Sequence, residues 1–149
     1  MKFISHRGNL KSTIKEEENN PEIIIKVIKL GFEVEIDLRV NKSKLYLGHD
    51  FNQYLIDESF LIKNRNKLWI HAKNDDAIKY LVNHNKNYNY FWHENDAYTI
   101  TSKGFLWTHV NTNSKFKNSN YIFSNNTILT LPELSKIKNI KLILKKNYY

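Results

Sequence analysis

The segment FEVEIDLRV, from Phe32 to Val40, decides the fold because apolar and charged side chains alternate along it. In an extended strand successive side chains point to opposite faces, so Glu35 and Asp37 share one face while Val34 and Ile36 occupy the other. Two interpretations fit this pattern. On an edge strand the two carboxylates are merely exposed to water. If they instead line the interior of a barrel, burying both of them requires a cation.

A helix is predicted before this strand and a turn after it. Asn20-Pro21-Glu22 has the features of a helix start, with Asn as the N-cap, Pro at the first helical position and an acid in the first turn. We expect the helix to run to Leu30 and to end at Gly31. Beyond the strand, Asn41-Lys42-Ser43 indicates a turn, and Leu45 to Leu47 a short return strand.

Further β-rich segments alternate with helical or loop segments along the rest of the chain, which predicts a mainly parallel sheet with crossover connections. No composition shift or linker divides the sequence, so a single domain over residues 1–149 is expected. A second helix is predicted from a cap at Asn74 or Asp75 to about Val82. The main strands are expected at Lys2–Ser5, Phe32–Val40, Leu68–His71, Tyr88–Trp92, Phe105–Val110, Thr127–Leu131 and Ile140–Leu144.

The overall charge of the chain is positive. Its 149 residues include 23 Lys and Arg against 15 Asp and Glu, a formal charge of +8. This excess fits either a generic basic surface or a face that attracts anions such as phosphodiesters, nucleic acid or an anionic membrane. The absence of cysteine excludes disulfides, thiolate metal sites and thiol catalysis. Neither a cleavable signal pattern nor an apolar run of about 18 residues is present, so we expect a cytoplasmic protein without a membrane span.

Polar side chains gather where the predicted strands end. A single histidine at such a point is more often structural than catalytic, but several together with two same-side carboxylates form a candidate reactive set of acid, base and metal ligands. In an α/β barrel the carboxyl ends of the strands converge on the active face. The residues concerned are His6 and Arg7, His49 and Asp50, His71 and Lys73, Trp92 with His93 and Glu94, and Thr108 with His109.

In order and spacing, these residues resemble the glycerophosphodiester phosphodiesterase family. That family carries His-Arg-Gly, Glu-Asn-Thr, Glu-x-Asp and His-Asp motifs, and the chain has His6-Arg7-Gly8, Glu18-Asn19-Asn20, Glu35-Ile36-Asp37 and His49-Asp50. The segments 68–74, 91–93 and 101–104 are similar to a small bacterial branch of the family that is associated with cell-surface polysaccharide synthesis.

The resemblance implies a TIM-barrel-like (β/α) barrel and metal-dependent hydrolysis of a glycerophosphodiester, a reaction of lipid metabolism. The barrel is expected to be shortened or incomplete, with about seven main strands plus the return strand, because such barrels typically need about 250 residues. The implied roles are acid-base catalysis for His6 and His49, phosphate contacts for Arg7 and Lys73, and metal ligation for Glu35 and Asp37. His71 is expected as a further metal ligand because imidazole can bind a divalent ion. Glu18 and Asp50 are expected as ligands or orienting groups, and Trp92, His93, Trp107 and His109 at the pocket rim.

The chain departs from the family pattern in three respects. The family usually supplies a further carboxylate ligand where this chain has His71, and Asn20 replaces the usual Thr. Residues after about 110 match no functional motif. The expected cofactor is a divalent cation, Mg²⁺ or Ca²⁺, with Mn²⁺ or a similar ion as the alternative that His71 introduces.

Two alternative functions remain open at this point. The first is a non-catalytic family member that binds a phosphodiester without cleaving it. The second is a nucleic-acid binder, which the charge and the aromatic content favour, although the aromatics fall mostly in strand-like segments and no nucleic-acid-binding motif is present. We therefore expect a small phosphodiester as the partner and no nucleic acid. An incomplete barrel also exposes sheet edges through which a homodimer could form.

Overall fold

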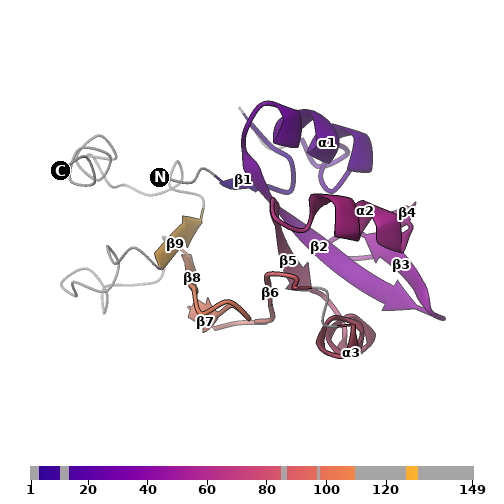
Figure 1. Ribbon diagram of the computed structural model, residues 1–149, viewed down its shortest axis with the longest axis vertical. Coiled ribbons are helices and arrows are strands. Elements are labelled where there is room, and N and C mark those ends of the chain that lie inside the picture. The colour runs from indigo at the N-terminus through magenta and orange to yellow at the C-terminus, as the bar shows by residue number, and fades with distance from the viewer. Residues whose placement is uncertain (1–3, 11–13, 85–86, 97, 110–126, 131–149) are drawn as a thin grey trace. The chain divides into compact units, whose positions relative to one another are not determined.

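The computed structural model describes residues 4–10, 14–84, 87–96, 98–109 and 127–130. The chain forms two compact units, an N-terminal unit over Lys2–Trp92 and a C-terminal unit that begins at His93. Figure 1 shows the elements of both units in chain colours. Whether both units belong to one phosphodiesterase-like domain stays a prediction.

The N-terminal unit alternates strands and helices. Its elements are β1 (Ile4–His6), α1 (Pro21–Lys29), β2 (Glu33–Asn41), β3 (Lys44–Leu47), β4 (Tyr54–Ile56), α2 (Glu58–Asn64), β5 (Leu68–Ala72), α3 (Asp75–Asn83) and β6 (Tyr90–Phe91). The C-terminal unit contains β7 (Tyr98–Ile100), β8 (Leu106–His109) and β9 (Thr127–Thr130). In that unit β7 pairs antiparallel with β8, and β8 pairs parallel with β9.

The sheet of the N-terminal unit is mixed and has the order β4-β3-β2-β5-β6, with β1 also paired to β2. β1, β2, β5 and β6 run parallel to one another, whereas β3 runs antiparallel to both β2 and β4. Val34 is the register partner of both Ser5 and Leu68, so β1 and β5 lie on opposite edges of β2. The described residues show no closure of this sheet. The barrel, and a homodimer formed through its open edges, therefore stay predictions.

The apolar core lies on one face of this sheet. Val34, Ile36 and Leu38 of β2 are all buried on that face, as the alternation of the strand predicts. They cluster with residues from all three described helices, including Ile24, Leu61 and Leu81. Full burial of such a side chain contributes roughly 1.5–3 kcal/mol. The helices therefore cover the even-numbered face of β2, and Glu35 and Asp37 point to the other.

The two helices predicted from capping signals are confirmed. At the start of α1 the Asn20 side chain accepts a hydrogen bond from the Glu22 amide at 2.9 Å, and Gly31 follows the helix with a φ of +97°. At the start of α3 the Asn74 side chain accepts from the Ala77 amide at 3.1 Å. These contacts satisfy backbone N–H groups that have no partner within the helix.

Three short elements, β4, α2 and β7, were not expected from the sequence. β4 pairs with β3, and α2 begins after Asp57, whose side chain accepts a hydrogen bond from the Phe60 amide at 3.1 Å. The strand expected at Ile140–Leu144 lies outside the described residues. Among the helices that the structure describes, none has the length and apolar character needed to cross a bilayer.

Candidate active site

Strand register brings the predicted site residues of three neighbouring strands together. His6 of β1 is the register partner of Glu35, and His71 of β5 is the partner of Asp37. Paired residues on neighbouring strands point to the same side, and the strands lie about 4.8 Å apart. His6, Glu35, Asp37 and His71 therefore share the sheet face that the helices leave uncovered. Figure 1 shows β1, β2 and β5 side by side.

Glu35, Asp37 and His71 form what we term the ligand group. One potential ligand atom from each residue lies within 4.8 Å of the others. His71 Nδ1 is 3.3 Å from Asp37 Oδ1 and 3.8 Å from Glu35 Oε1. The Glu35 and Asp37 residues are 2% and 0% exposed. The interpretation of these carboxylates as the solvated face of an edge strand is therefore wrong.

Buried carboxylate oxygens in the ligand group lack hydrogen-bond partners. Glu35 Oε2 and Asp37 Oδ1 are both buried without one. Glu33, on the same face of β2, behaves differently because its Oε2 accepts a hydrogen bond from Trp69 Nε1 at 2.7 Å. A buried acceptor without a partner costs roughly 1–3 kcal/mol, and more when it is charged. Two such oxygens beside an imidazole nitrogen fit a divalent cation that would coordinate all three residues.

The Arg7 guanidinium stands next to the ligand group. Its Nε lies 2.8 Å from Asp37 Oδ2, and its Nη1 donates a hydrogen bond to Glu18 Oε2 at 2.9 Å. Glu18 Oε1 in turn accepts from Asn9 Nδ2 at 3.2 Å. Glu18 thus orients Arg7, and these two hydrogen bonds explain its position without a role as a metal ligand. Arg7 has a φ of +55° and is followed by Gly8 at +89°, which turns the chain sharply after β1.

Asn19 is a site residue to which we assigned no role from the sequence. Its Nδ2 donates to Asp37 Oδ2 at 2.9 Å, and its Oδ1 accepts from the Asp37 backbone N–H at 2.9 Å. The Asn19 N–H also donates to the Arg7 carbonyl at 3.0 Å. The residue is fully buried with a φ of +61°, a conformation that Asn adopts more readily than most residues. Asn19 therefore fixes the orientation of Asp37, and its place in the motif beside Glu18 was the available signal.

His49, Asp50 and Lys73 form a second cluster, which we term the His49 group. His49 Nδ1 is 2.7 Å from Asp50 Oδ1, and its Nε2 is 3.3 Å from Lys73 Nζ. The His49 side chain is 37% exposed and that of Asp50 is 82% exposed. Asp50 has a pKa below its usual range because of its hydrogen bond with His49. An imidazole oriented by a carboxylate on one nitrogen is suited to accept a proton at the other.

The backbone holds the His49 group next to the ligand group. The Gly48 N–H donates to the Asp37 carbonyl at 3.0 Å, and the Lys73 N–H donates to the Leu38 carbonyl at 2.9 Å. Arg39 Nη2 donates to the His49 carbonyl at 2.8 Å. Gly48 has a φ of +151°, and a Cβ at this position would collide with the Phe51 carbonyl oxygen. Only glycine therefore fits this turn without displacing the backbone at Phe51.

The two carboxylates of the ligand group have opposite pKa shifts. Burial, together with the charge of Asp37, raises the pKa of Glu35 well above its usual range. Burial alone would also raise the pKa of Asp37, but His71, Arg7 and Asn19 together outweigh it and lower that pKa. The positive charge of Lys73 partly opposes the shift at Glu35, so the His49 group acts electrostatically on the ligand group.

The four residues expected at the pocket rim divide between the two units. Trp92 directly follows β6 and is 44% exposed. Phe91, just before it, stacks on His71 with a ring distance of 4.9 Å. His93, Trp107 and His109 belong to the C-terminal unit, where Trp107 is buried. Their role at the rim stays a prediction.

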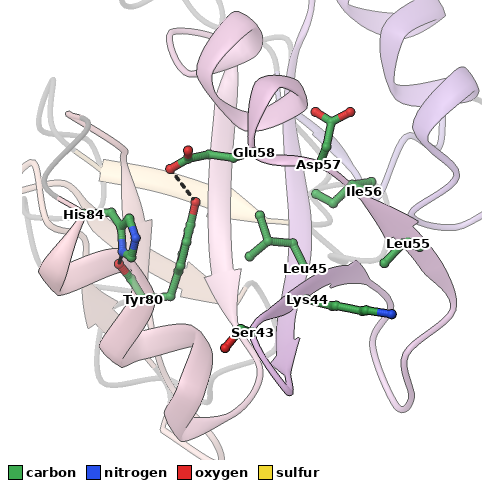
Figure 2. A pocket seen from close by; sticks show the side chains of 9 residues that line it. All are labelled: Ser43, Lys44, Leu45, Leu55, Ile56, Asp57, Glu58, Tyr80 and His84. Atoms are coloured by element: carbon green, nitrogen blue, oxygen red, sulfur yellow. Dashed lines mark hydrogen bonds between the residues drawn. The ribbon is translucent and has the colours of Figure 1, made fainter.

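A groove of about 570 Å³ lies elsewhere in the N-terminal unit, between the β3–β4 hairpin, α2 and α3. Figure 2 shows its lining side chains, among them Leu45, Tyr80 and His84. The Tyr80 hydroxyl already donates to Glu58 Oε1 at 2.9 Å, and the His84 ring stacks on Tyr80. None of the predicted catalytic or ligand residues lines this groove. We therefore locate the candidate chemistry at the ligand group.

Comparison with known proteins leaves this geometry as the main guide to function, because no family model, curated protein or solved structure matches the chain.

Proposed function

We propose that this protein is a metal-dependent phosphodiester hydrolase that acts on a glycerophosphodiester-like substrate. The observation that carries the proposal is the pair of buried, hydrogen-bond-deficient carboxylate oxygens of Glu35 and Asp37, with His6 and His71 on the same sheet face. The His49 group beside them supplies an oriented imidazole and a cation. The order of the family-like motifs along the chain supports the same reaction class.

A divalent cation held by Glu35, Asp37 and His71 would offset negative charge on a non-bridging oxygen of the phosphodiester. The donor set suits such an ion because two carboxylates and one imidazole present ligand atoms within 4.8 Å of one another. Arg7 and Asn19 both contact Oδ2 of Asp37, so Oδ1 is the oxygen that would be available to a bound ion. The ligand geometry is thus set before substrate binds, the condition under which electrostatic stabilisation is most effective.

His49 is the residue that we assign as the general base. With the proton on Nδ1, which Asp50 accepts at 2.7 Å, Nε2 is left free to take a proton from a substrate hydroxyl. Lys73 Nζ lies 3.3 Å from this nitrogen and can move to a phosphoryl oxygen when substrate enters. General acid-base groups positioned in this way contribute roughly 10²–10⁴-fold to the rate.

His6, next to Glu35 of the ligand group, is assigned as the general acid. Its Nε2 lies 3.8 Å from Glu35 Oε2, and its side chain is 24% exposed, so substrate can reach it. The hydroxyl next to the phosphate gives its proton to His49 and attacks phosphorus, while the bond to the leaving alkoxide breaks and His6 protonates it. Water then opens the resulting cyclic phosphate with the two histidines in exchanged roles. The small phosphodiester partner and a cytoplasmic location belong to the same proposal.

The proposal is tested by following a glycerol phosphodiester by ³¹P NMR with the protein before and after removal of divalent cations. We expect cation-dependent conversion to a phosphomonoester, lost in His49→Ala and retained in the matched control His84→Ala, whose histidine lies outside the site. Conversion that is unaffected by cation removal contradicts the proposal. Saturable binding of the diester without conversion would instead favour the non-catalytic alternative.

A further inference from the structure

We propose that the ligand group selects a first-row transition-metal ion of the Mn²⁺, Co²⁺ and Zn²⁺ series over Mg²⁺ and Ca²⁺, and that His71 is the residue that determines this preference. The inference rests on the proposed function in that it concerns the same cation. It can nevertheless be tested on metal binding alone.

The position of the His71 ring carries the inference. Its Nδ1 faces both carboxylates, at 3.3 Å from Asp37 Oδ1 and 3.8 Å from Glu35 Oε1. The residue is only 6% exposed, and the ring stacks on Phe91 with an interplanar angle of 18°. The parallel pairing of β5 with both β2 and β6 sets the backbone on either side of this ring. Packing as well as charge therefore directs the imidazole at one oxygen of each carboxylate, Asp37 Oδ1 and Glu35 Oε1.

An imidazole nitrogen changes which ion the group prefers. Mg²⁺ and Ca²⁺ are hard ions that take oxygen ligands, and Mg²⁺ gives up its bound waters reluctantly. Imidazole is a better ligand for later first-row ions, and the affinity of a nitrogen-containing site rises from Mn²⁺ through Co²⁺. A group of two carboxylates and one nitrogen, all buried, therefore favours the transition-metal ion. The order of affinity expected here is Mg²⁺ and Ca²⁺ below Mn²⁺, with Co²⁺ and Zn²⁺ above it.

A structural role for His71 makes a different prediction. As an imidazolium, it would act as the counter-charge to Glu35 and Asp37, and no ion would enter between them. Cations would then leave stability unchanged, and replacing His71 with a neutral residue would make cation binding stronger. The two roles therefore give effects of opposite sign on cation affinity.

The test uses the full chain stripped of metal and titrated separately with Mg²⁺, Ca²⁺, Mn²⁺, Co²⁺ and Zn²⁺, with thermal stability as the readout. We expect the transition-metal ions to act at concentrations at least about tenfold lower than Mg²⁺ or Ca²⁺. His71→Gln, which offers an oxygen donor, should lose about 10–100-fold in Co²⁺ and Zn²⁺ affinity, while His84→Gln should not. Equal action of all five ions on the wild-type protein, or an unchanged preference in His71→Gln, overturns the inference.

A second readout does not require the variant to fold. In the wild-type protein, Zn²⁺ should move the ¹⁵N resonance of the His71 Nδ1 atom to the range of a metal-bound nitrogen, and Co²⁺ should give visible absorption bands. An unmoved His71 resonance at saturating Zn²⁺ overturns the inference. Zn²⁺ binding through His71 without turnover of any diester would support the inference and contradict the proposed function. Turnover without any preference among the five cations would support the proposed function and overturn the inference.

Discussion

The ligand group and the His49 group lie next to each other but differ in exposure. The side chains of Glu35 and Asp37 are 3% and 0% exposed, whereas that of Asp50 is 82% exposed and that of His49 is 37% exposed. Burial strengthens electrostatic interactions and suits groups that hold a fixed charge. A group that exchanges protons with substrate and water needs access to solvent. The difference assigns ion binding to the first group and proton transfer to the second, and the predictions below test that division.

The largest effect is expected in the His49 group. His49→Ala should reduce turnover of a phosphodiester by about 10²–10⁴-fold, because it removes the oriented proton acceptor. The cation-dependent increase in thermal stability should stay as in the wild-type protein. Within the described part of the chain, the His49 ring bonds to Asp50 and Lys73 and not to the ligand group. Steady-state kinetics and thermal unfolding with and without cation check both parts. Loss of the cation response in His49→Ala would show that the two groups do not act separately.

The next largest effect is expected in the ligand group. Glu35→Gln should weaken cation affinity by about 10–100-fold and lower turnover with it. It should not lower the stability of the metal-free protein at neutral pH, because burial disfavours the charged form of Glu35 and its Oε2 has no hydrogen-bond partner. Glu33→Gln is the matched control, since Glu33 is buried on the same strand face but bonded to Trp69. A cation titration that is the same for Glu35→Gln and Glu33→Gln contradicts the assignment.

Part of the fold and of the candidate site could be predicted from the sequence. The alternation of Phe32–Val40 predicted the strand and the shared face of Glu35 and Asp37, because side-chain alternation is a local property. The Asn20 cap was predicted, and the second helix cap was predicted at Asn74 or Asp75, because capping also depends on residues close in sequence. Whether the carboxylates were buried or solvated was left open, since that depends on segments distant in the sequence.

Other features depend on contacts that no local pattern encodes. α2 has seven residues and β4 three, so each is too short to leave a strong periodic signal, and packing stabilises them. Asn19 makes a hydrogen bond to Asp37, eighteen residues away in the sequence. Its backbone adopts a left-handed conformation there. The orientation of the His71 ring follows from its register with β2 and its stacking on Phe91.

A smaller effect is expected from Asn19, which makes two hydrogen bonds with Asp37 of the ligand group. Asn19→Ala should lower the free energy of unfolding by about 1–3 kcal/mol, because it leaves the buried Asp37 N–H without its acceptor. It should also raise the cation concentration needed for half-maximal stabilisation, since Asp37 loses a contact that orients it. Urea unfolding with and without cation measures both effects. Asn20→Ala, which removes only a helix cap, serves as the control and should leave cation affinity unchanged.

The smallest effect is expected in the pH dependence of the metal-free protein. The pKa of Glu35 is raised in the folded state, so the folded protein retains a proton that the unfolded chain releases near pH 4.3. Stability should therefore fall as pH rises from that value toward the raised pKa, by at most about 1.4 kcal/mol per pH unit. Urea unfolding of the wild-type protein and Glu35→Gln, in the presence of a chelator, measures the difference in slope. Equal slopes in the two proteins would contradict the assigned pKa shift.

The most direct test of the central claim is a cation titration of the metal-stripped protein in which hydrolysis of a glycerol phosphodiester and thermal stability are measured on the same samples. If the ligand group holds the catalytic ion, the two curves should rise at the same cation concentration in the wild-type protein and shift together in Glu35→Gln. Hydrolysis that proceeds without added cation, or that rises at a concentration unrelated to the stability curve, would contradict the account.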